Sequence, residues 1–245
     1  MTTSIHDWTS TVALVTGANG GLGRAFVDEL LRLGVRKVYA ASRSVLLQPT
    51  DERVVPIILD VTAPSQVRAA ANQARDVTLL VNNAGINMQS GVFSPDCTDA
   101  ARREMEVNYF GILSMSQAFA STLIERQGTM INVLSILARI ALAPMATLCA
   151  SKAAALRLTE SLAAELGPQG VHVLALLPGA IDTAMSRDYP GEKLAPLDVV
   201  TAALDAVSKR DYEIYVGGMA QGVAAALAAD RAAVQAQFLA LATAT

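Results

Sequence analysis

Residues 12–33 of the chain read VALVTGANGGLGRAFVDELLRL. The apolar run at residues 12–15 predicts a short buried strand, and the apolar residues of the second half recur at helical spacing. The turn between them contains Gly17, Gly21 and Gly23, which allow a sharp bend and a close approach to a ligand. Because the free amides and the positive dipole end of a helix attract phosphate, this order predicts a dinucleotide pyrophosphate site.

The glycines follow the spacing T-G-x-x-x-G-x-G, which resembles the short-chain dehydrogenase/reductase family. A glycine-rich helix start can also reflect a need for flexible residues alone. The strand before the turn and the helix after it favour the nucleotide site. The resemblance implies that the turn binds the cofactor through Gly17, Asn19, Gly20, Gly21, Leu22 and Gly23.

Length and composition favour one globular domain. A chain of 245 residues fits a single doubly wound α/β domain. With 52% hydrophobic and 17% charged residues, disorder is not expected, and a net charge of -3 without a basic run predicts no nucleic-acid partner. The first residues lack the pattern of a secretory signal, and polar residues together with Pro144 interrupt the most apolar region, residues 131–150, so no membrane span is expected.

The numbers of cysteines and histidines indicate which cellular compartment and which metal sites to expect. Cys97 and Cys149 are too few for a disulfide framework and fit a reducing cytoplasm. His6 and His172 are the only histidines, and there is no paired Cys/His spacing, so no metal site is expected. We therefore expect a cytoplasmic protein without a structural zinc ion.

Strand-like and helix-like stretches alternate to the end without a linker or repeat, which favours one Rossmann-type domain over residues 1–245. The pattern predicts a doubly wound parallel sheet of about seven strands with helices on both faces. Strands are expected at residues 12–15, 37–41, 54–59, 77–81, 129–134, 171–177 and 213–216. Helices are expected from residue 21, from near residue 64, and at 98–126, 147–166, 196–209 and 219–241, with a substrate lid at 185–195.

The end of the second strand bears on the choice of cofactor. Ser42 and Arg43 stand where an NAD-preferring protein usually has an acidic residue that binds the adenosine ribose. A lone arginine is commonly just a solvated loop charge. Since a guanidinium suits a 2′-phosphate, its place after this strand favours NADP(H).

Three further motifs match the resembling family. The resemblance implies that Asp60 and Val61 contact the adenine, whereas Asp60 or Thr62 alone would suit a cap for the helix near Pro64; both can hold together. The N-N-A-G motif at residues 82–85 implies backbone close to the adenine ribose and asparagine amides that tie the central strands together. The cofactor residues implied by this motif and by P-G-x-x-x-T at 178–183 are Asn83, Ala84, Gly85, Pro178, Gly179, Ile181 and Thr183.

The resemblance also implies a catalytic set. Asn108 would hold a water that links the lysine to solvent, and Ser135 at the end of the fifth strand would orient the substrate. The segment CASKAAA at residues 149–155 resembles Y-x-A-S-K-A-A, and its Lys152 matches the lysine that binds the nicotinamide ribose. The family's tyrosine position, four residues before that lysine, is occupied by Leu148.

This leucine changes the expected chemistry. Residues four apart on a helix share a face, so Leu148 and Lys152 should point into one site. Leucine has no exchangeable proton, and loss of a general acid lowers a rate by about 10² to 10⁴. Cys149 is turned by about 100° from the lysine and is expected to be packed. The remaining donors are Tyr189 in the lid, Tyr109, which would face another direction, and a relay from Lys152 through Ser135 or water.

An iminium substrate needs no acid, because it arrives already protonated. Leu148, with Leu137, Ile140 and Met145, would line an apolar pocket for it, and Tyr189 would contact the substrate from the lid. The sequence therefore favours an NADPH-dependent imine reductase acting on a small apolar cyclic imine. The alternatives are a carbonyl or enone reductase with a relocated donor, a catalytically silent NADP(H)-binding protein, or a leucine introduced by engineering.

The resemblance implies self-association through the two long helices at residues 98–126 and 147–166. Their alanine-rich faces would permit close packing, so a homodimer or homotetramer is expected. The same faces would also serve simply to cover the sheet.

Overall fold

The computed structural model describes residues 7–44 and 51–242, with side chains to residue 238. All strands pair in parallel in one seven-stranded sheet of order β3-β2-β1-β4-β5-β6-β7. The strand order reverses between β1 and β4, which makes their carboxyl ends the place where ligands bind in such sheets. The strands are β1 (Val12–Thr16), β2 (Lys37–Ser42), β3 (Val54–Ile58), β4 (Leu79–Asn82), β5 (Thr129–Val133), β6 (His172–Pro178) and β7 (Glu213–Val216). The predicted fold class is confirmed, and the strand bounds differ by at most two residues at either end.

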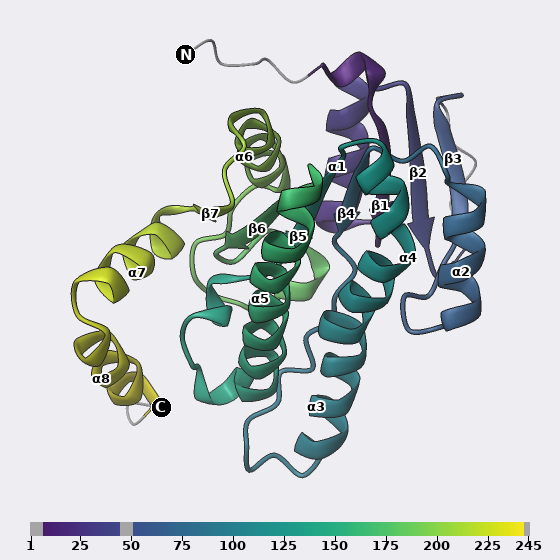
Figure 1. Cartoon of the computed structure of the whole chain (residues 1–245). Helices are drawn as coiled ribbons and strands as arrows, with labels where there is room; N and C mark the ends of the chain where they lie inside the picture. Colours follow the sequence, from purple (N-terminus) through teal and green to yellow (C-terminus); the bar gives the residue numbers. More distant parts are fainter. Residues whose placement is uncertain (1–6, 45–50, 243–245) are drawn as a thin grey trace.

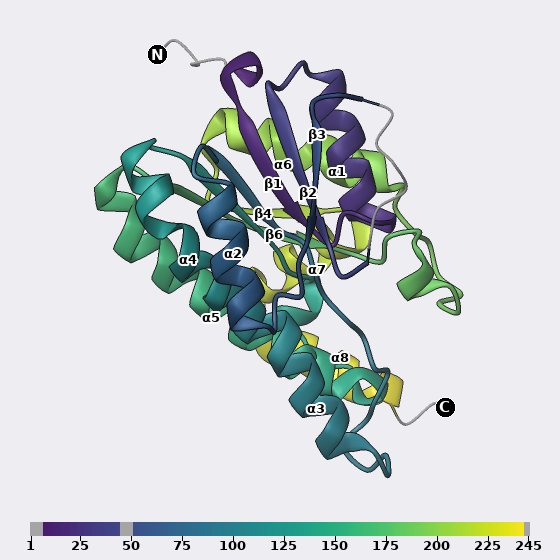
Figure 2. The same cartoon turned by 90° about the vertical axis from the view of Figure 1, so that its right-hand side faces the viewer.

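Helices cover both faces of the sheet, as Figures 1 and 2 show. One face packs against α1 (Gly21–Arg32) and α6 (Pro196–Lys209), which also contact each other. The other face packs against α2 (Pro64–Gln73), α4 (Gly111–Glu125) and α5 (Ala146–Leu166). No helix within residues 7–44 and 51–242 is both long enough and apolar enough to cross a membrane.

The alternation of side chains along each strand explains this three-layer packing. Successive residues of a strand point to opposite faces, so a strand covered on both sides must be apolar throughout. In β1, Ala13 and Val15 belong to the core beneath α1 and α6, whereas Val12 and Leu14 belong to the core beneath α2 and α4. The strands are therefore unbroken apolar runs because the sheet packs against a hydrophobic core on each of its two faces.

The expected helix at residues 98–126 is interrupted by a wider turn. It consists of α3 (Cys97–Met105), a π-helical turn (Glu106–Phe110) and α4. The inserted turn changes which side chains face inward, and Asn108 within it is fully buried. Such π-turns occur frequently at functional sites.

The alanine-rich tail differs from the single helix expected at residues 219–241. It forms α7 (Gly218–Ala229) and α8 (Arg231–Ala242), separated by Asp230 in extended backbone. The Asp230 carboxylate accepts a hydrogen bond from the Ala233 N–H at 3.0 Å and so caps α8, which overrides the helix propensity of the alanines. Both helices extend from β7 to one side of the three-layer body (Figure 1).

The segment expected as a lid begins with a short 3-10 turn, Ala184–Ser186. Its two ends are held together by a bridge between Ile181 and Leu194. The first residues of the chain, from which no secretory signal is expected, include residues 1–6. These six lie outside the described residues.

Candidate active site

The glycine turn after β1 has a backbone shape that favours glycine. Gly17 and Gly21 adopt positive φ angles of +68° and +52°. A Cβ atom on Gly23 would point into the carbonyl oxygen of Gly17 and lie 2.6 Å from Asn83 Nδ2. The N-cap of α1 is Gly20, which has no side chain to occupy the helix start. The turn therefore brings bare backbone amides to the positive end of α1, as a phosphate site requires.

The N-N-A-G segment packs directly on this turn. Asn83 Nδ2 donates to the Thr16 carbonyl at 2.8 Å, and the Thr16 hydroxyl accepts from the N–H groups of Asn83 and Ala84 at 2.9 and 3.0 Å. Asn82 Nδ2 donates to Asn132 Oδ1 at 2.8 Å across β4 and β5. The two asparagines thus tie β1, β4 and β5 together at their carboxyl ends.

The P-G-x-x-x-T segment reaches the same turn from β6. A Cβ atom on Gly21 would lie 3.1 Å from Thr183 Cγ2, so the threonine packs against the start of α1. Gly179 follows β6 and donates its N–H to the Val216 carbonyl at 3.0 Å. The sequence-predicted cofactor residues of three separate motifs are therefore neighbours.

The loop after β2 lies beside the glycine turn. Asn19 Nδ2 donates to Ser44 Oγ at 2.7 Å, and the buried Ser42 hydroxyl donates to the Ser44 carbonyl at 2.6 Å. Arg43 is exposed between them. This places the guanidinium on a short, internally hydrogen-bonded loop next to the expected adenosine end of the cofactor site.

Asp60 and Val61 follow β3 in the neighbouring loop. Asp60 Oδ1 accepts hydrogen bonds from the Thr62 N–H at 2.9 Å and from the Thr62 hydroxyl at 2.7 Å. The hydrogen bond from the Thr62 N–H lowers the pKa of Asp60, and the charge of the nearby Arg43 makes a smaller contribution. The N-cap of α2 is Ala63, not Asp60 or Thr62, so the capping expectation was wrong. Pro64, with its fixed φ, starts this helix without a side-chain cap.

Lys152 lies within the fold on α5. Its Nζ donates to the Val133 carbonyl at 2.9 Å at the end of β5, and burial lowers the pKa of Lys152 to about 8. A Cβ atom on Gly85 would be 3.6 Å from this nitrogen and 3.2 Å from Asn108 Oδ1. The structure thus brings the predicted Asn108 and Lys152 together beside Gly85 of the N-N-A-G loop.

Asn108 binds this loop through both ends of its amide. Its Oδ1 accepts from the Ile86 N–H at 2.9 Å, and its Nδ2 donates to the Ile86 carbonyl and to Ser151 Oγ, each at 3.0 Å. Ser135 is half-buried after β5, where its hydroxyl accepts from the Leu137 N–H at 3.1 Å and caps a 3-10 turn. Ser135 and Lys152 both lie at the carboxyl end of β5.

Leu148 is one helical turn before Lys152 and is 6% exposed. Cys149 is packed as expected, since its Sγ accepts from the Leu142 N–H at 3.4 Å and burial raises the pKa of the thiol.

Tyr189 turns toward its own loop, because a Cβ atom on Gly191 would lie 2.5 Å from the tyrosine hydroxyl oxygen. Tyr109 stacks edge to face on Phe110 with ring centroids 4.9 Å apart.

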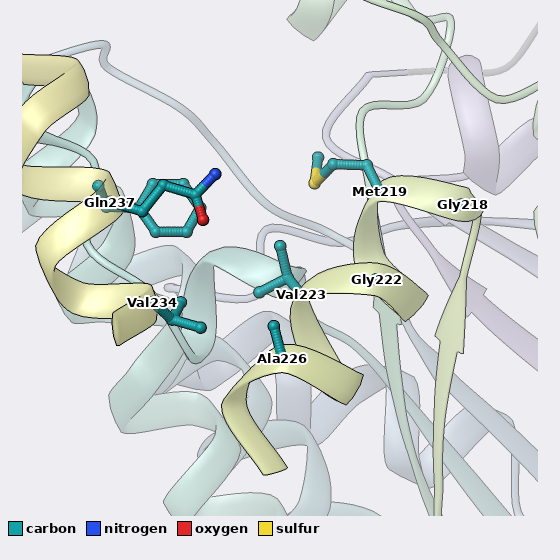
Figure 3. Close-up of a pocket in the computed structure, with 8 residues that line it drawn as sticks. Gly218, Met219, Gly222, Val223, Ala226, Val234 and Gln237 are labelled. Atoms are coloured by element: carbon teal, nitrogen blue, oxygen red, sulfur yellow. The ribbon is translucent and has the colours of Figure 1, made fainter. Parts of the chain in front are cut away.

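A cavity of about 300 Å³ between α7 and α8 was not predicted from the sequence. Side chains from the two helices point toward each other across it (Figure 3). Leu137, Met145, Leu148 and Tyr189, the predicted pocket residues, do not line it. The lining consists of Gly218, Met219, Gly222, Val223, Ala226, Val234, Gln237 and Phe238.

This cavity adjoins the cofactor motifs through Met219, whose Cε would be 3.4 Å from a Cβ atom on Gly179. The one sequence signal for the cavity is Asp230, a helix-capping residue inside an alanine-rich run. Met145, in contrast, precedes α5 and brings its sulfur to 4.0 Å from Asn87 Nδ2.

Comparison with known proteins places this architecture among dehydrogenases. A family model described as short chain dehydrogenase matches residues 11–193. An NADPH-dependent 1-acyldihydroxyacetone phosphate reductase from Schizosaccharomyces pombe is 33% identical over 178 residues, which are 69% of this chain and 60% of the relative. An uncharacterised oxidoreductase from Staphylococcus saprophyticus is 30% identical over 214 residues, 81% of this chain and 91% of the relative.

A solved structure is similar over almost the whole chain. It is a short chain dehydrogenase from Burkholderia cenocepacia in complex with NADP, with a TM-score of 0.93 and 50% sequence identity. The match covers 96% of this chain and 99% of the other.

Proposed function

This chain belongs to the short-chain dehydrogenase family, and we propose that it is an NADPH-dependent reductase of C=N bonds in a small apolar substrate. The observation that carries the proposal is Leu148, a buried apolar side chain one turn before Lys152 on α5. A departure from a family pattern inside an otherwise complete site is where specificity is expected to differ.

The residues around the glycine turn fit NADP(H). Any larger residue at Gly23 would collide with the Gly17 carbonyl and distort the turn, and Gly20 leaves the amides of α1 open to a pyrophosphate. Arg43 would bind the 2′-phosphate, and Thr183 and Lys152 would hold the nicotinamide end. The similar Burkholderia protein binds NADP, which supports the same cofactor here. When bound, NADPH supplies the hydride for the reduction.

The need for a proton donor distinguishes a ketone substrate from an iminium ion. A ketone gains hydride on carbon and must also gain a proton on oxygen, and Leu148 cannot provide it. An iminium ion already carries its proton on nitrogen, so hydride addition to carbon completes an amine. Leu148, Leu137 and Met145 would exclude water from this carbon, and Ser135 would orient the nitrogen through its hydroxyl.

The cavity between α7 and α8 is a candidate for the body of the substrate. Its lining is apolar except for Gln237, and Met219 connects it to Gly179. Such pockets bind ligands mainly by apolar contact, with few polar groups that set orientation. A small, largely apolar cyclic imine fits this composition.

A second candidate function, reduction of a carbonyl or enone, is favoured by Lys152. Because burial brings the pKa of Lys152 to about 8, the ammonium group can release a proton near neutral pH, directly or through water. The structure gives less support to Tyr189 as the relocated donor, since its hydroxyl lies against Gly191.

The test is NADPH consumption by the purified protein with a cyclic imine and, separately, with a cyclic ketone of the same ring size. Turnover of the imine at a rate at least about 10²-fold above the ketone supports the proposal. Turnover of the ketone alone overturns it in favour of carbonyl reduction. Binding of NADPH without turnover of either substrate indicates a silent binding protein.

Two further expectations accompany this proposal. We infer a homodimer or homotetramer that pairs through the helices at residues 98–126 (α3 and α4) and 147–166 (α5), which size-exclusion chromatography with light scattering tests directly. A cytoplasmic location also stays a prediction from the cysteine content.

A further inference from the structure

Glu104 on α3 is a carboxylate with no exposed surface. Its Oε1 accepts a hydrogen bond from the Met88 N–H at 2.7 Å. Its Oε2 is buried and has no hydrogen-bond partner within the described residues. A buried carboxylate with an unpaired oxygen is costly, so its presence calls for a physical reason.

The position of Glu104 relates it to the active site. Glu104 and Asn108 are four residues apart on continuous helical backbone, and both hold the loop that follows the N-N-A-G motif. Asn108 binds Ile86 through both its amide atoms, and Glu104 binds Met88. The loop at residues 85–88 is therefore fastened to this helix at two points.

Lys152 adjoins the same loop. A Cβ atom on Gly85 would be 3.6 Å from its Nζ and 3.2 Å from Asn108 Oδ1. The helices that carry the two charges, α3 and α5, also contact each other. The carboxylate and the ammonium group thus both adjoin residues 85–88, although they form no direct ion pair within 4.0 Å.

Electrostatics couples the two groups. Burial lowers the pKa of Lys152, and the negative charge of Glu104 acts in the opposite direction. Glu104 is the one charged group among the described residues with such an effect on Lys152. The pKa of the Cys149 thiol, also on α5, is raised mainly by burial, and the charge of Glu104 adds to this effect. In a water-poor interior, charges interact over longer distances than at the surface.

We propose that Glu104 is a positioning residue of the active site, whose buried carboxylate compensates the charge of Lys152 and clamps residues 85–88 beside it. This rests on the proposed function in so far as the charge of Lys152 serves the reduction. The coupling itself is a property of the folded chain and is measurable without turnover.

The direct test is the titration of Lys152 in Glu104→Gln, followed by NMR of protein labelled with [¹³C]lysine. Glutamine keeps an oxygen for the Met88 N–H and removes only the charge. The chain has four lysines, at 37, 152, 193 and 209, so Lys152→Met assigns the signal. We expect the midpoint of Lys152 to fall by about one pH unit.

Glu106→Gln is the matched control, since it removes the same charge from an exposed position on the next stretch of helix. It should leave the Lys152 midpoint unchanged. An unchanged midpoint in Glu104→Gln as well would overturn the proposal.

A thermal-unfolding cycle keeps the proposal testable even if Glu104→Gln is poorly folded. Each single variant, Glu104→Gln and Lys152→Met, leaves a buried group uncompensated, whereas the double variant removes both charges. We expect the double variant to lose less stability than the sum of the losses in Glu104→Gln and Lys152→Met. If Glu104→Gln fails to fold, the double variant should still fold. Additive losses, or a double variant that also fails to fold, contradict the proposed coupling. Failure of imine turnover with coupling intact would refute the proposed function alone.

Discussion

Gly23 on α1 lies so close to Asn83 in the N-N-A-G loop that a Cβ atom on the glycine would be 2.6 Å from Asn83 Nδ2. The same atom would run into the carbonyl of Gly17. The contact joins the start of α1 to the end of β4. It shows that the glycine at this position is required by packing within the protein itself.

Gly23→Ala should therefore destabilise the protein before any cofactor is added. We expect a loss of about 1–3 kcal/mol, the usual range for overpacking, measured by urea denaturation. Gly20→Ala is the control, because a Cβ there meets nothing within 4 Å and its backbone is extended. Equal stability of the two variants would show that the turn can relax around the added methyl group.

Cofactor preference should depend on the charge after β2. Replacing Arg43 by aspartate removes a partner for the 2′-phosphate and adds one for a ribose hydroxyl. The ratio of NADPH to NADH affinity should fall about 10- to 100-fold, as expected for loss of one charge-assisted contact. Arg36→Asp makes the same change at the opposite, amino end of β2 and should leave the ratio unchanged. A ratio that stays constant in Arg43→Asp would place the 2′-phosphate elsewhere.

Restoring a hydroxyl at residue 148 should extend the substrate range. In Leu148→Tyr, the phenol would share a helix face with Lys152, whose charge favours the phenolate and so eases proton release. Ketone reduction should rise by about 10² to 10⁴ in kcat/KM, measured by NADPH consumption. Leu148→Phe, which adds the ring without the hydroxyl, should show no such gain. If both variants gain ketone activity equally, ring shape rather than proton donation explains the effect.

NADPH binding should weaken as the pH rises through about 8. Burial sets the pKa of Lys152 near this value, so its charge is present below it and lost above it. We expect the dissociation constant to increase a few-fold over that interval in fluorescence titrations. Lys152→Arg keeps its charge over the whole interval. The NADPH affinity of Lys152→Arg, even if lower at every pH, should show no transition near pH 8. A transition retained in this variant would assign it to another group.

Local patterns were sufficient for most of the fold. The helix Pro196–Lys209 and the strand Glu213–Val216 were predicted to the residue. Side-chain periodicity and turn residues act within a few positions along the chain, and both could be read directly. The alanine-rich tail was predicted less well, because one capping residue, Asp230, outweighed the propensity of its neighbours.

The candidate site was predicted in its residues but not in its environment. Asn108, Ser135 and Lys152 were identified from motifs, and the structure brings them to the carboxyl ends of β4 and β5. The π-helical turn that buries Asn108 had no sequence signature, and the cavity behind Met219 had Asp230 as its one signal. Both arise from packing between elements, which periodicity within one element does not encode.

By itself, the sequence determined the order of the strands and helices, the parallel doubly wound class, and the residue types available for chemistry, including Leu148 four residues before Lys152. The tertiary structure decided which of these groups share an environment. Glu104 and Lys152 are distant in the chain, yet both adjoin residues 85–88 inside the protein. Burial and the field of neighbouring charges set the pKa of such groups, and both depend on segments that come together only when the chain folds.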